Sequence, residues 1–175
     1  MISDYIKKVV RDVPDFPKEG IVFKDITPIL QDVELCKAIT KEFSIRIKEL
    51  NPDVIVGVES RGFLFGMLIA QELGIPFVPI RKKGKLPSDC FSVAYELEYG
   101  SACIEMHKDA IDEGKRVVIH DDLLATGGTV IASAELMKKA KANLVGFSFI
   151  IGLDFLSANE KLKSYSSNII TLANY

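Results

Sequence analysis

The chain has 175 residues and a formal net charge of −2, with 22 basic and 24 acidic side chains. That length predicts one domain with a sizeable core, and the small negative charge gives no general attraction to nucleic acid or to an anionic membrane. The three cysteines, which lack C-x-x-C spacing, argue against a disulfide framework or a zinc site and favour a reducing cytoplasm; we also expect no membrane span and no targeting leader.

The first third of the chain predicts two helices around an irregular segment. A short amphipathic helix is expected from Asp4 to Asp12. Two prolines and a glycine argue against any regular element from Val13 to Gly20, and Ile21 to Pro28 is expected to be extended. Asp32 is placed to cap a helix from Val33 to about Leu50, along which apolar residues recur at helical spacing.

The remainder of the chain alternates strands with helices. The expected strands are 54–58, 76–80, 117–120, 144–152 and 169–172, and the expected helices are 63–73, 130–140 and 155–162. Between them, the runs 91–97 and 101–106 are suited to pair as a hairpin. This alternation predicts an α/β fold with a mainly parallel central sheet flanked by helices, in which ligands bind beyond the carboxyl ends of the strands.

The stretch VVIHDDLLATGGT, residues 117–129, combines a buried strand, two carboxylates and a small-residue turn. A helix that starts after such a turn offers free N–H groups and a positive dipole end to an anion, and glycines allow a close approach. Carboxylates accept hydrogen bonds from paired sugar hydroxyls. We therefore expect Asp121 and Asp122, placed where the strand ends, to hold a ribose whose phosphate lies in the turn. The alternative is a plain strand–helix connection with solvated aspartates.

Two further strand ends carry cations. Ser60 and Arg61 open a helix directly after the strand 54–58, an arrangement that suits a pyrophosphate. Arg81, Lys82, Lys83 and Lys85 follow the strand 76–80 and form a second candidate clamp for a polyanion. A solvated helix start and a solvated basic face are the alternatives. Because the ends of parallel strands meet at one edge of a sheet, we expect all three strand ends to share one site.

These segments resemble the motifs of the type I phosphoribosyltransferase family. Residues 117–129 are similar to its signature for phosphoribosyl pyrophosphate (PRPP), and Leu123 to Thr129 has the form of the members that act on adenine. Ser60-Arg61-Gly62-Phe63, the segment 81–87 and the segment 95–100 resemble its pyrophosphate, basic and lid segments. The pattern from Asp15 to Pro28 resembles the N-terminal segment of the adenine members. The resemblance implies a single domain, 1–175, with a small N-terminal hood, 1–33, and a flexible β-hairpin lid, 83–106.

The resemblance also implies a role for each site residue. The phosphate would lie on Ala125, Thr126, Gly127, Gly128 and Thr129, and the pyrophosphate on Ser60, Arg61, Arg81, Lys82 and Lys85. The Val22 carbonyl and the Lys24 amide would bind adenine between Phe23 and Leu123. Catalytic roles would fall to Arg61, Asp121, Asp122 and Glu98, the last moving the purine proton, while Tyr99 of the lid packs over the site. For Glu98 and Tyr99 a hairpin turn with an exposed Glu and a packed Tyr is the alternative.

The implied reaction is adenine plus PRPP giving AMP plus pyrophosphate, as in purine salvage. The implied cofactor is Mg²⁺ carried by PRPP, with no direct protein ligand and with contact to Asp121 and Asp122 through water. The implied assembly is a cytoplasmic homodimer whose other partners are these small molecules, without nucleic acid or membrane. Two alternatives stay open: a transferase for another base, and a PRPP-sensing regulator, which would need a nucleic-acid-binding module. His120 stands where the family signature has an aliphatic residue, and it either orients Asp121 or is simply tolerated.

Overall fold

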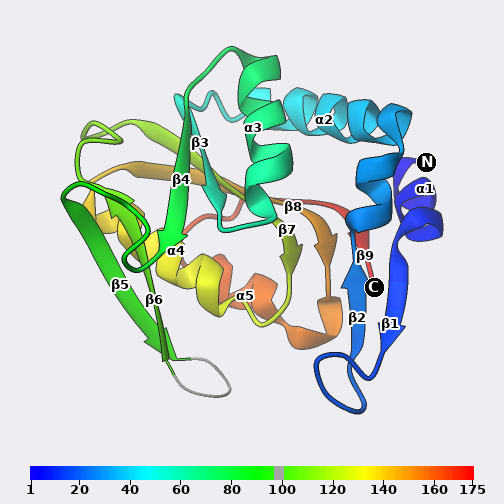
Figure 1. Ribbon diagram of the computed structural model, residues 1–175. Helices are drawn as coiled ribbons and strands as arrows, with labels where there is room; N and C mark the ends of the chain where they lie inside the picture. The colour runs from blue at the N-terminus through cyan, green and yellow to red at the C-terminus, as the bar shows by residue number, and fades with distance from the viewer. Residues whose placement is uncertain (97–100) are drawn as a thin grey trace.

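The computed structural model describes residues 1–96 and 101–175, in which one central sheet of seven strands and a separate ribbon of two strands are found (Figure 1). The strands are β1 (Arg11–Pro14), β2 (Val22–Asp25), β3 (Val54–Val58), β4 (Phe77–Lys82), β5 (Cys90–Glu96), β6 (Ser101–His107), β7 (Arg116–Leu124), β8 (Asn143–Gly152) and β9 (Ile169–Asn174). The helices are α1 (Ile2–Val9), α2 (Val33–Lys48), α3 (Gly62–Leu73), α4 (Gly128–Lys139) and α5 (Ala158–Leu162), with 3₁₀ turns at η1 (Thr27–Gln31) and η2 (Asp154–Leu156).

The central sheet has the strand order β5-β6-β4-β3-β7-β8-β9, and the five strands from β4 to β9 in that order run parallel. Helices α2 and α3 cover one face, and α4 and α5 cover the other (Figure 1). Alternate residues of β7 therefore enter different cores: Val117 and Ile119 pack with α4, while Val118 packs with α2 and α3. This double coverage explains why the sheet strands are continuous apolar runs, and it confirms the predicted fold class. No helix in the described ranges is both long and apolar enough to cross a bilayer.

The hairpin predicted in the middle of the chain is confirmed as β5 and β6. The two strands pair antiparallel, and β6 continues the sheet by pairing with the end of β4, where Glu105 lies opposite Arg81. Strand β5 lies over α4, and Lys139 of that helix donates from Nζ to the carbonyl oxygen of Ser92 at 2.6 Å. The hairpin is thus an extension of the central sheet rather than a separate appendage.

The N-terminal segment differs from expectation. The first helix ends at Val9, and the chain continues as β1, which pairs antiparallel with β2 so that Pro14 lies opposite Val22. The prediction of irregular chain from Val13 was therefore wrong at its first two residues. Proline is tolerated there because it is the last residue of an edge strand. The spacing of residues did not predict this strand, because β1 is stabilised by backbone hydrogen bonds to β2 and not by a pattern within its own residues.

The ends of two helices confirm the sequence-based assignments. Asp32 caps α2 by accepting from the Leu35 amide at 2.9 Å. Gly74 ends α3 in the left-handed conformation, with φ of 68°.

Strands β4 and β7 are longer than predicted. Pairing with β8 carries β7 through Asp121 and Asp122 to Leu124, so the prediction that the strand ends at these acids was wrong. Pairing with β6 carries β4 through Arg81 to Lys82. In both cases a neighbouring strand supplies backbone partners to residues whose charges had suggested a loop.

His120, next to the two acids on β7, is fully buried. Its Nδ1 lies 2.9 Å from the Ser148 hydroxyl oxygen, its ring packs edge-on against Phe43, and Nε2 has no hydrogen-bond partner. Burial lowers the pKa of His120 to about 3. Below pH 6.5 the unfolded chain therefore binds a proton at His120, whereas the folded chain does not. The free energy of unfolding consequently falls as the pH drops from 6.5 towards 3.

The replacement His120→Leu should make folding less sensitive to acid. Between pH 7 and pH 5 the unaltered chain should lose about 2 kcal/mol of unfolding free energy on account of His120, and the variant should lack that loss. Urea unfolding at the two pH values measures it. The partly buried His107, replaced in the same way, is the matched control. An equal pH dependence in His120→Leu and the unaltered chain would contradict a neutral buried imidazole.

Candidate active site

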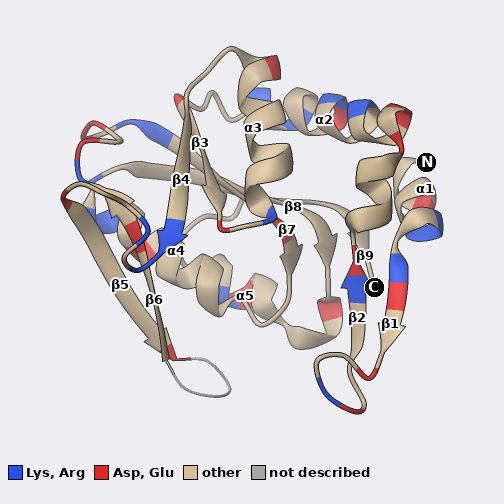
Figure 2. Ribbon diagram, viewed as in Figure 1, with Lys and Arg blue, Asp and Glu red and all other residues tan. Residues whose placement is uncertain are grey.

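The carboxyl ends of β4, β3 and β7 lie side by side because these strands are neighbours in the sheet. The segments that follow or end them carry the acidic and basic residues singled out from the sequence, and Figure 2 shows charged residues where β3 and β4 end. The predicted convergence of three strand ends on one edge is confirmed. The predicted residues Glu98 and Tyr99 lie outside the described part of the chain.

The two adjacent carboxylates occupy different surroundings. Asp122 is 3 % exposed, and its Oδ2 lies 2.8 Å from Nε of Arg61 without hydrogen-bond geometry. Asp121 accepts from the Asp122 amide through Oδ1 at 2.9 Å. Burial raises the pKa of both carboxyls, and the charge of Asp122 raises the pKa of Asp121 further, while Arg61 opposes both shifts. A ligand that offers hydroxyl donors would relieve this crowded pair of acids.

Arg61 connects the carboxylates to the N-terminal ribbon. Its guanidinium carbon lies 5.1 Å from the centre of the Phe23 ring, on β2, while its Nε pairs with Asp122. The sequence suggested that Arg61 faces pyrophosphate, whereas in this structure it lies between a ribbon residue and a carboxylate. The next residue, Gly62, begins α3 against β7, where a Cβ would lie only 2.8 Å from the His120 carbonyl oxygen. Glycine there permits the close contact of helix and strand.

The basic segment 81–85 is organised by a buried acid that sequence reasoning missed. The Glu59 side chain is 8 % exposed; it accepts from the Lys82 amide at 2.8 Å and from Lys85 Nζ at 2.5 Å, and it lies 3.5 Å from Nε of Arg81. Burial raises the pKa of Glu59, but these donors and charges together bring it below its ordinary value. The signal was present in the sequence, since an acid follows a buried strand immediately before Ser60.

A second buried acid, Glu105, holds the same segment from the hairpin side. It accepts from the Gly84 amide at 2.9 Å and from the Ser92 hydroxyl at 3.0 Å. The two acids thus fix backbone N–H groups on either side of Lys83. A run of four cations in five residues repels itself, and buried carboxylates that bind its backbone offset part of that repulsion.

The small-residue turn begins α4. Gly127 precedes the helix with φ of 83°, and the turn lines a hollow of about 90 Å³ together with Asp121 and Leu123. Thr129 lies in the first turn of α4, where its hydroxyl oxygen is 3.0 Å from that of Tyr95 on β5. The structure therefore places a helix N-terminus, two threonines and a carboxylate around one small space, which fits a phosphate next to sugar hydroxyls.

Strand β2 offers backbone groups for hydrogen bonding near Arg61, which contacts Phe23 of this strand. Only β1 pairs with it among the described strands, so one of its edges is unpaired. In a strand the carbonyl of one residue and the amide two residues later point to the same edge, as do those of Val22 and Lys24. Phe23, between them, packs edge-on against Phe16 with ring centres 5.3 Å apart. The Lys24 side chain, by contrast, turns away to Asp12, whose Oδ1 lies 2.6 Å from Nζ.

Known proteins resemble this chain in sequence and in fold. The model of the phosphoribosyl transferase domain family matches residues 25–169. A curated relative from Cytophaga hutchinsonii, named adenine phosphoribosyltransferase, is 52% identical over 175 residues, which cover 100% of this chain and 97% of the relative. The crystal structure of adenine phosphoribosyltransferase from Thermoanaerobacter pseudethanolicus matches with a TM-score of 0.95 and 46% identity over 100% of both chains. That of the Saccharomyces cerevisiae enzyme, complexed with adenine and an imino-altritol bisphosphate, matches with a TM-score of 0.92 and 42% identity over 98% of both.

The variant Gly127→Ala should lose both stability and phosphate affinity. A Cβ is strained at φ of 83° and would lie 3.2 Å from Ala158, which should cost about 1–2 kcal/mol of unfolding free energy. Gly114→Ala is the matched control, because Gly114 has φ of 81° and open space around it. Calorimetric titration with ribose 5-phosphate should show weaker binding only for Gly127→Ala. Equal affinities in the two variants would contradict the turn's role as a phosphate site.

Proposed function

The chain belongs to the phosphoribosyl transferase family, and from that membership we propose that it makes AMP and pyrophosphate from adenine and PRPP in purine salvage. The main observation in support of this proposal is the series of contacts from Phe23 through Arg61 to Asp122. It joins the strand with an unpaired backbone edge to the carboxylates beside the phosphate turn. A base, a ribose and a 5-phosphate thereby have adjoining places in the order in which they are linked in AMP. Relatives of about half identical sequence carry the matching name.

Adenine suits the backbone edge of β2. The base offers a donor at N6 and an acceptor at N1, which complement the Val22 carbonyl and the Lys24 amide. A 6-oxopurine presents an acceptor and a donor at the same places and would leave both backbone groups opposed. Phe23 and Leu123 are the proposed apolar contacts of the ring. The Saccharomyces cerevisiae relative was solved with adenine, which supports this choice of base.

The ribose and its phosphate would be held from β7 and α4. The turn from Ala125 to Thr129 binds the 5-phosphate through backbone N–H groups, hydroxyls and the helix dipole. Asp121 and Asp122 accept from the ribose hydroxyls. As the bond to pyrophosphate breaks, positive charge develops at the anomeric carbon, and the carboxylates stabilise it. Binding energy from the distant phosphate thus orients the reacting carbon.

The pyrophosphate group of PRPP would bind the donors that Glu59 now holds. Lys85 and Arg81 contact that carboxylate, and the Ser60–Arg61 segment lies at the end of the same strand. Lys82 joins them at the end of β4. An incoming pyrophosphate has the same charge sign and acceptor chemistry as the carboxylate, so a preformed set of donors needs little rearrangement. Glu98 is the proposed proton-transfer residue and Tyr99 the proposed cover of the reacting centre, in a hairpin lid that limits access of water.

Mg²⁺ is the proposed cofactor, carried by PRPP. Asp121 and Asp122 would contact it through water, because carboxylate oxygens suit a hard cation. Asp122 Oδ2 accepts no hydrogen bond from a described residue, although Arg61 Nε lies 2.8 Å from it. When bound to pyrophosphate and ribose hydroxyls, the ion supplies neutralisation of the leaving group's charge.

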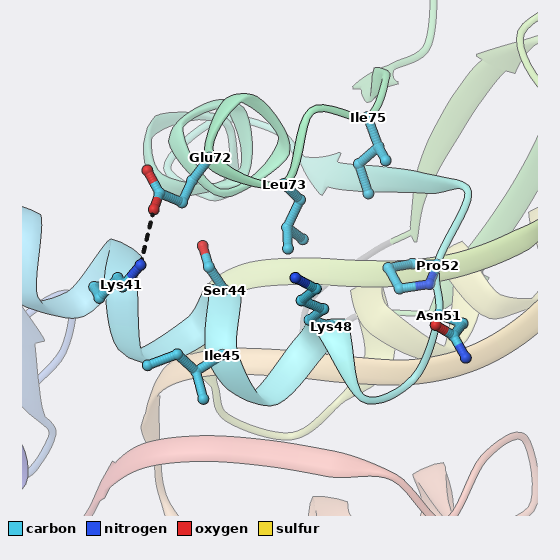
Figure 3. A pocket seen from close by; sticks show the side chains of 9 residues that line it. All are labelled: Lys41, Ser44, Ile45, Lys48, Asn51, Pro52, Glu72, Leu73 and Ile75. Atoms are coloured by element: carbon cyan, nitrogen blue, oxygen red, sulfur yellow. Dashed lines mark hydrogen bonds and ion pairs between the residues drawn. The ribbon is translucent and has the colours of Figure 1, made fainter.

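A homodimer is proposed through the apolar face of α2 and α3. Large side chains are exposed there: Leu30 and Val33 before and in α2, Ile45 in α2, and Leu64, Met67 and Leu68 in α3. Two hollows of about 560 and 290 Å³ lie along it. They meet at Lys41 and Glu72, which pair between the helices at 3.3 Å (Figure 3). An exposed apolar face of this extent, with the sheet buried behind it, is typical of a surface covered by a second copy.

The proposed location is the cytoplasm. The three cysteines are free thiols, and proteins with unpaired cysteines are typical of reducing compartments.

The test of the proposed function is pyrophosphate release with Mg²⁺, PRPP and one base at a time. Adenine should support release, whereas guanine, hypoxanthine, xanthine and orotate should not, because each lacks the matching donor and acceptor. Release with one of these and not with adenine would overturn the choice of base. Silence with every base, combined with binding of PRPP and of nucleic acid, would favour the regulator.

Replacing both Asp121 and Asp122 with Asn should lower kcat by a factor on the order of 10² to 10³, because the developing positive charge loses its carboxylates. The thermal midpoint should change far less than the rate. Near-normal turnover in the double variant would remove the ribose assignment.

The dimer proposal predicts that Leu68→Glu gives monomers in analytical ultracentrifugation, because a charge would be buried in the interface. Phe155→Glu is the matched control, since Phe155 is 72% exposed and lies outside the α2–α3 face. That variant should remain dimeric. A monomeric unaltered chain, or dissociation of both variants, would contradict the assignment of this face.

A further inference from the structure

The ribbon of β1 and β2 is placed by side chains, because neither of its strands pairs with a strand of the central sheet in the described part of the chain. Neighbouring residues of a strand point to opposite faces. Phe23 and Lys24 accordingly contact different parts of the fold. Arg61 lies over the Phe23 ring, while Lys24 Nζ lies 4.2 Å from the centre of the Tyr175 ring. Two cation–π contacts, one on each face, therefore hold the ribbon at Phe23 and Lys24. These residues lie next to the backbone groups that are proposed to bind the base.

Tyr175 is firmly tied to the central sheet. Its amide donates to the Gly152 carbonyl at 2.9 Å, and its own carbonyl accepts from the Asp154 amide at 3.1 Å. The ring is partly buried, and its hydroxyl is buried without a hydrogen bond to any described residue. Figure 1 shows this end of the chain beside β2.

Lys24 fills the space between Tyr175 and the ribbon. Its side chain is 13% exposed, and Asp12, directly opposite on β1, binds Nζ at 2.6 Å. A cation this far removed from water gains more from an aromatic face than an exposed one does. Nζ of Lys7, in α1, also lies 5.3 Å from the centre of the ring, so Tyr175 contacts cations of two N-terminal elements.

We propose that Tyr175 is a positioning residue for the nucleobase: its ring holds Lys24 so that the Val22 carbonyl and the Lys24 amide face the base. The inference rests on the proposed function for the identity of that base. It concerns only one half of the site, because the residues proposed for PRPP come from β7, from the end of β4 and from the segments after β3 and β7. Loss of the ring should therefore affect adenine and spare PRPP.

The experiment compares Tyr175→Leu with Tyr175→Phe in steady-state kinetics. Tyr175→Leu removes the aromatic face and should raise KM for adenine about threefold to tenfold, with KM for PRPP unchanged. Tyr175→Phe keeps the ring and loses a hydroxyl that makes no hydrogen bond, so it should behave as the unaltered chain. Equal effects of the two replacements, or equal rises in both KM values, would overturn the proposal.

Two further variants separate positioning from general loss of packing. Tyr165→Leu removes another ring under a lysine, Lys138 at 4.3 Å, on the opposite side of the sheet from the ribbon, and should leave KM for adenine unchanged. Lys24→Met removes the same contact together with the ion pair to Asp12, so it should raise KM for adenine at least as much as Tyr175→Leu does. The double variant should be no worse than Lys24→Met alone, because the contact between the two residues is already lost there. Additive effects would contradict a shared contact.

Amide hydrogen exchange gives a readout that does not depend on turnover. Amides of β2 should exchange faster in Tyr175→Leu than in Tyr175→Phe, while those of β7 should not change. An unchanged rate in β2 would overturn the proposal even if the chain used another base. Failure of the unaltered chain to use adenine, with faster exchange in Tyr175→Leu, would instead overturn the proposed function alone.

Discussion

The parallel pairing of β7 between β3 and β8 is the constraint on which the site depends. It places Asp121 and Asp122 in the last part of β7, where Asp122 is buried and Asp121 is partly buried, so their backbone cannot turn freely towards water. The same pairing places the end of β3 beside them, with Gly62 allowing α3 to start against β7. Arg61 is then within reach of Asp122. Loop flexibility contributes little to this arrangement, because strand pairing and helix contact determine it.

Charge in the site is balanced by buried acids. Glu59 and Glu105 bind backbone amides and cations of the segment 81–85, and Asp122 pairs with Arg61. Lys85 and Arg81, both proposed for pyrophosphate, are thus held by Glu59 before a ligand arrives. Preorganised donors need little rearrangement during the reaction. The net charge of −2 hides this local separation, and composition alone could not have shown it.

Local patterns predicted much of the fold and the chemical elements of the site. Asp32 as a cap, Gly74 as a helix end and the hairpin of β5 and β6 follow from side-chain chemistry within a few residues, and the structure confirms them. The ribbon of β1 and β2 and the continuation of β7 through two aspartates were not predicted. Both depend on a neighbouring strand that offers backbone partners, and such pairing overrides the loop tendency of Pro14 or Asp121.

By itself, the sequence determined which chemistry is present: a helix-starting turn of Thr and Gly, paired acids, two basic strand ends and an extended segment with free backbone groups. Those properties belong to residue types and short spacings. The tertiary structure alone determined which of these residues are in contact. It placed Arg61 against Phe23 and Asp122, and it paired Lys85 with Glu59. It also placed Tyr175, which follows the last strand, over Lys24 in β2. A contact such as that between Lys24 and Tyr175, 151 positions apart, depends on sheet order, which no local pattern encodes.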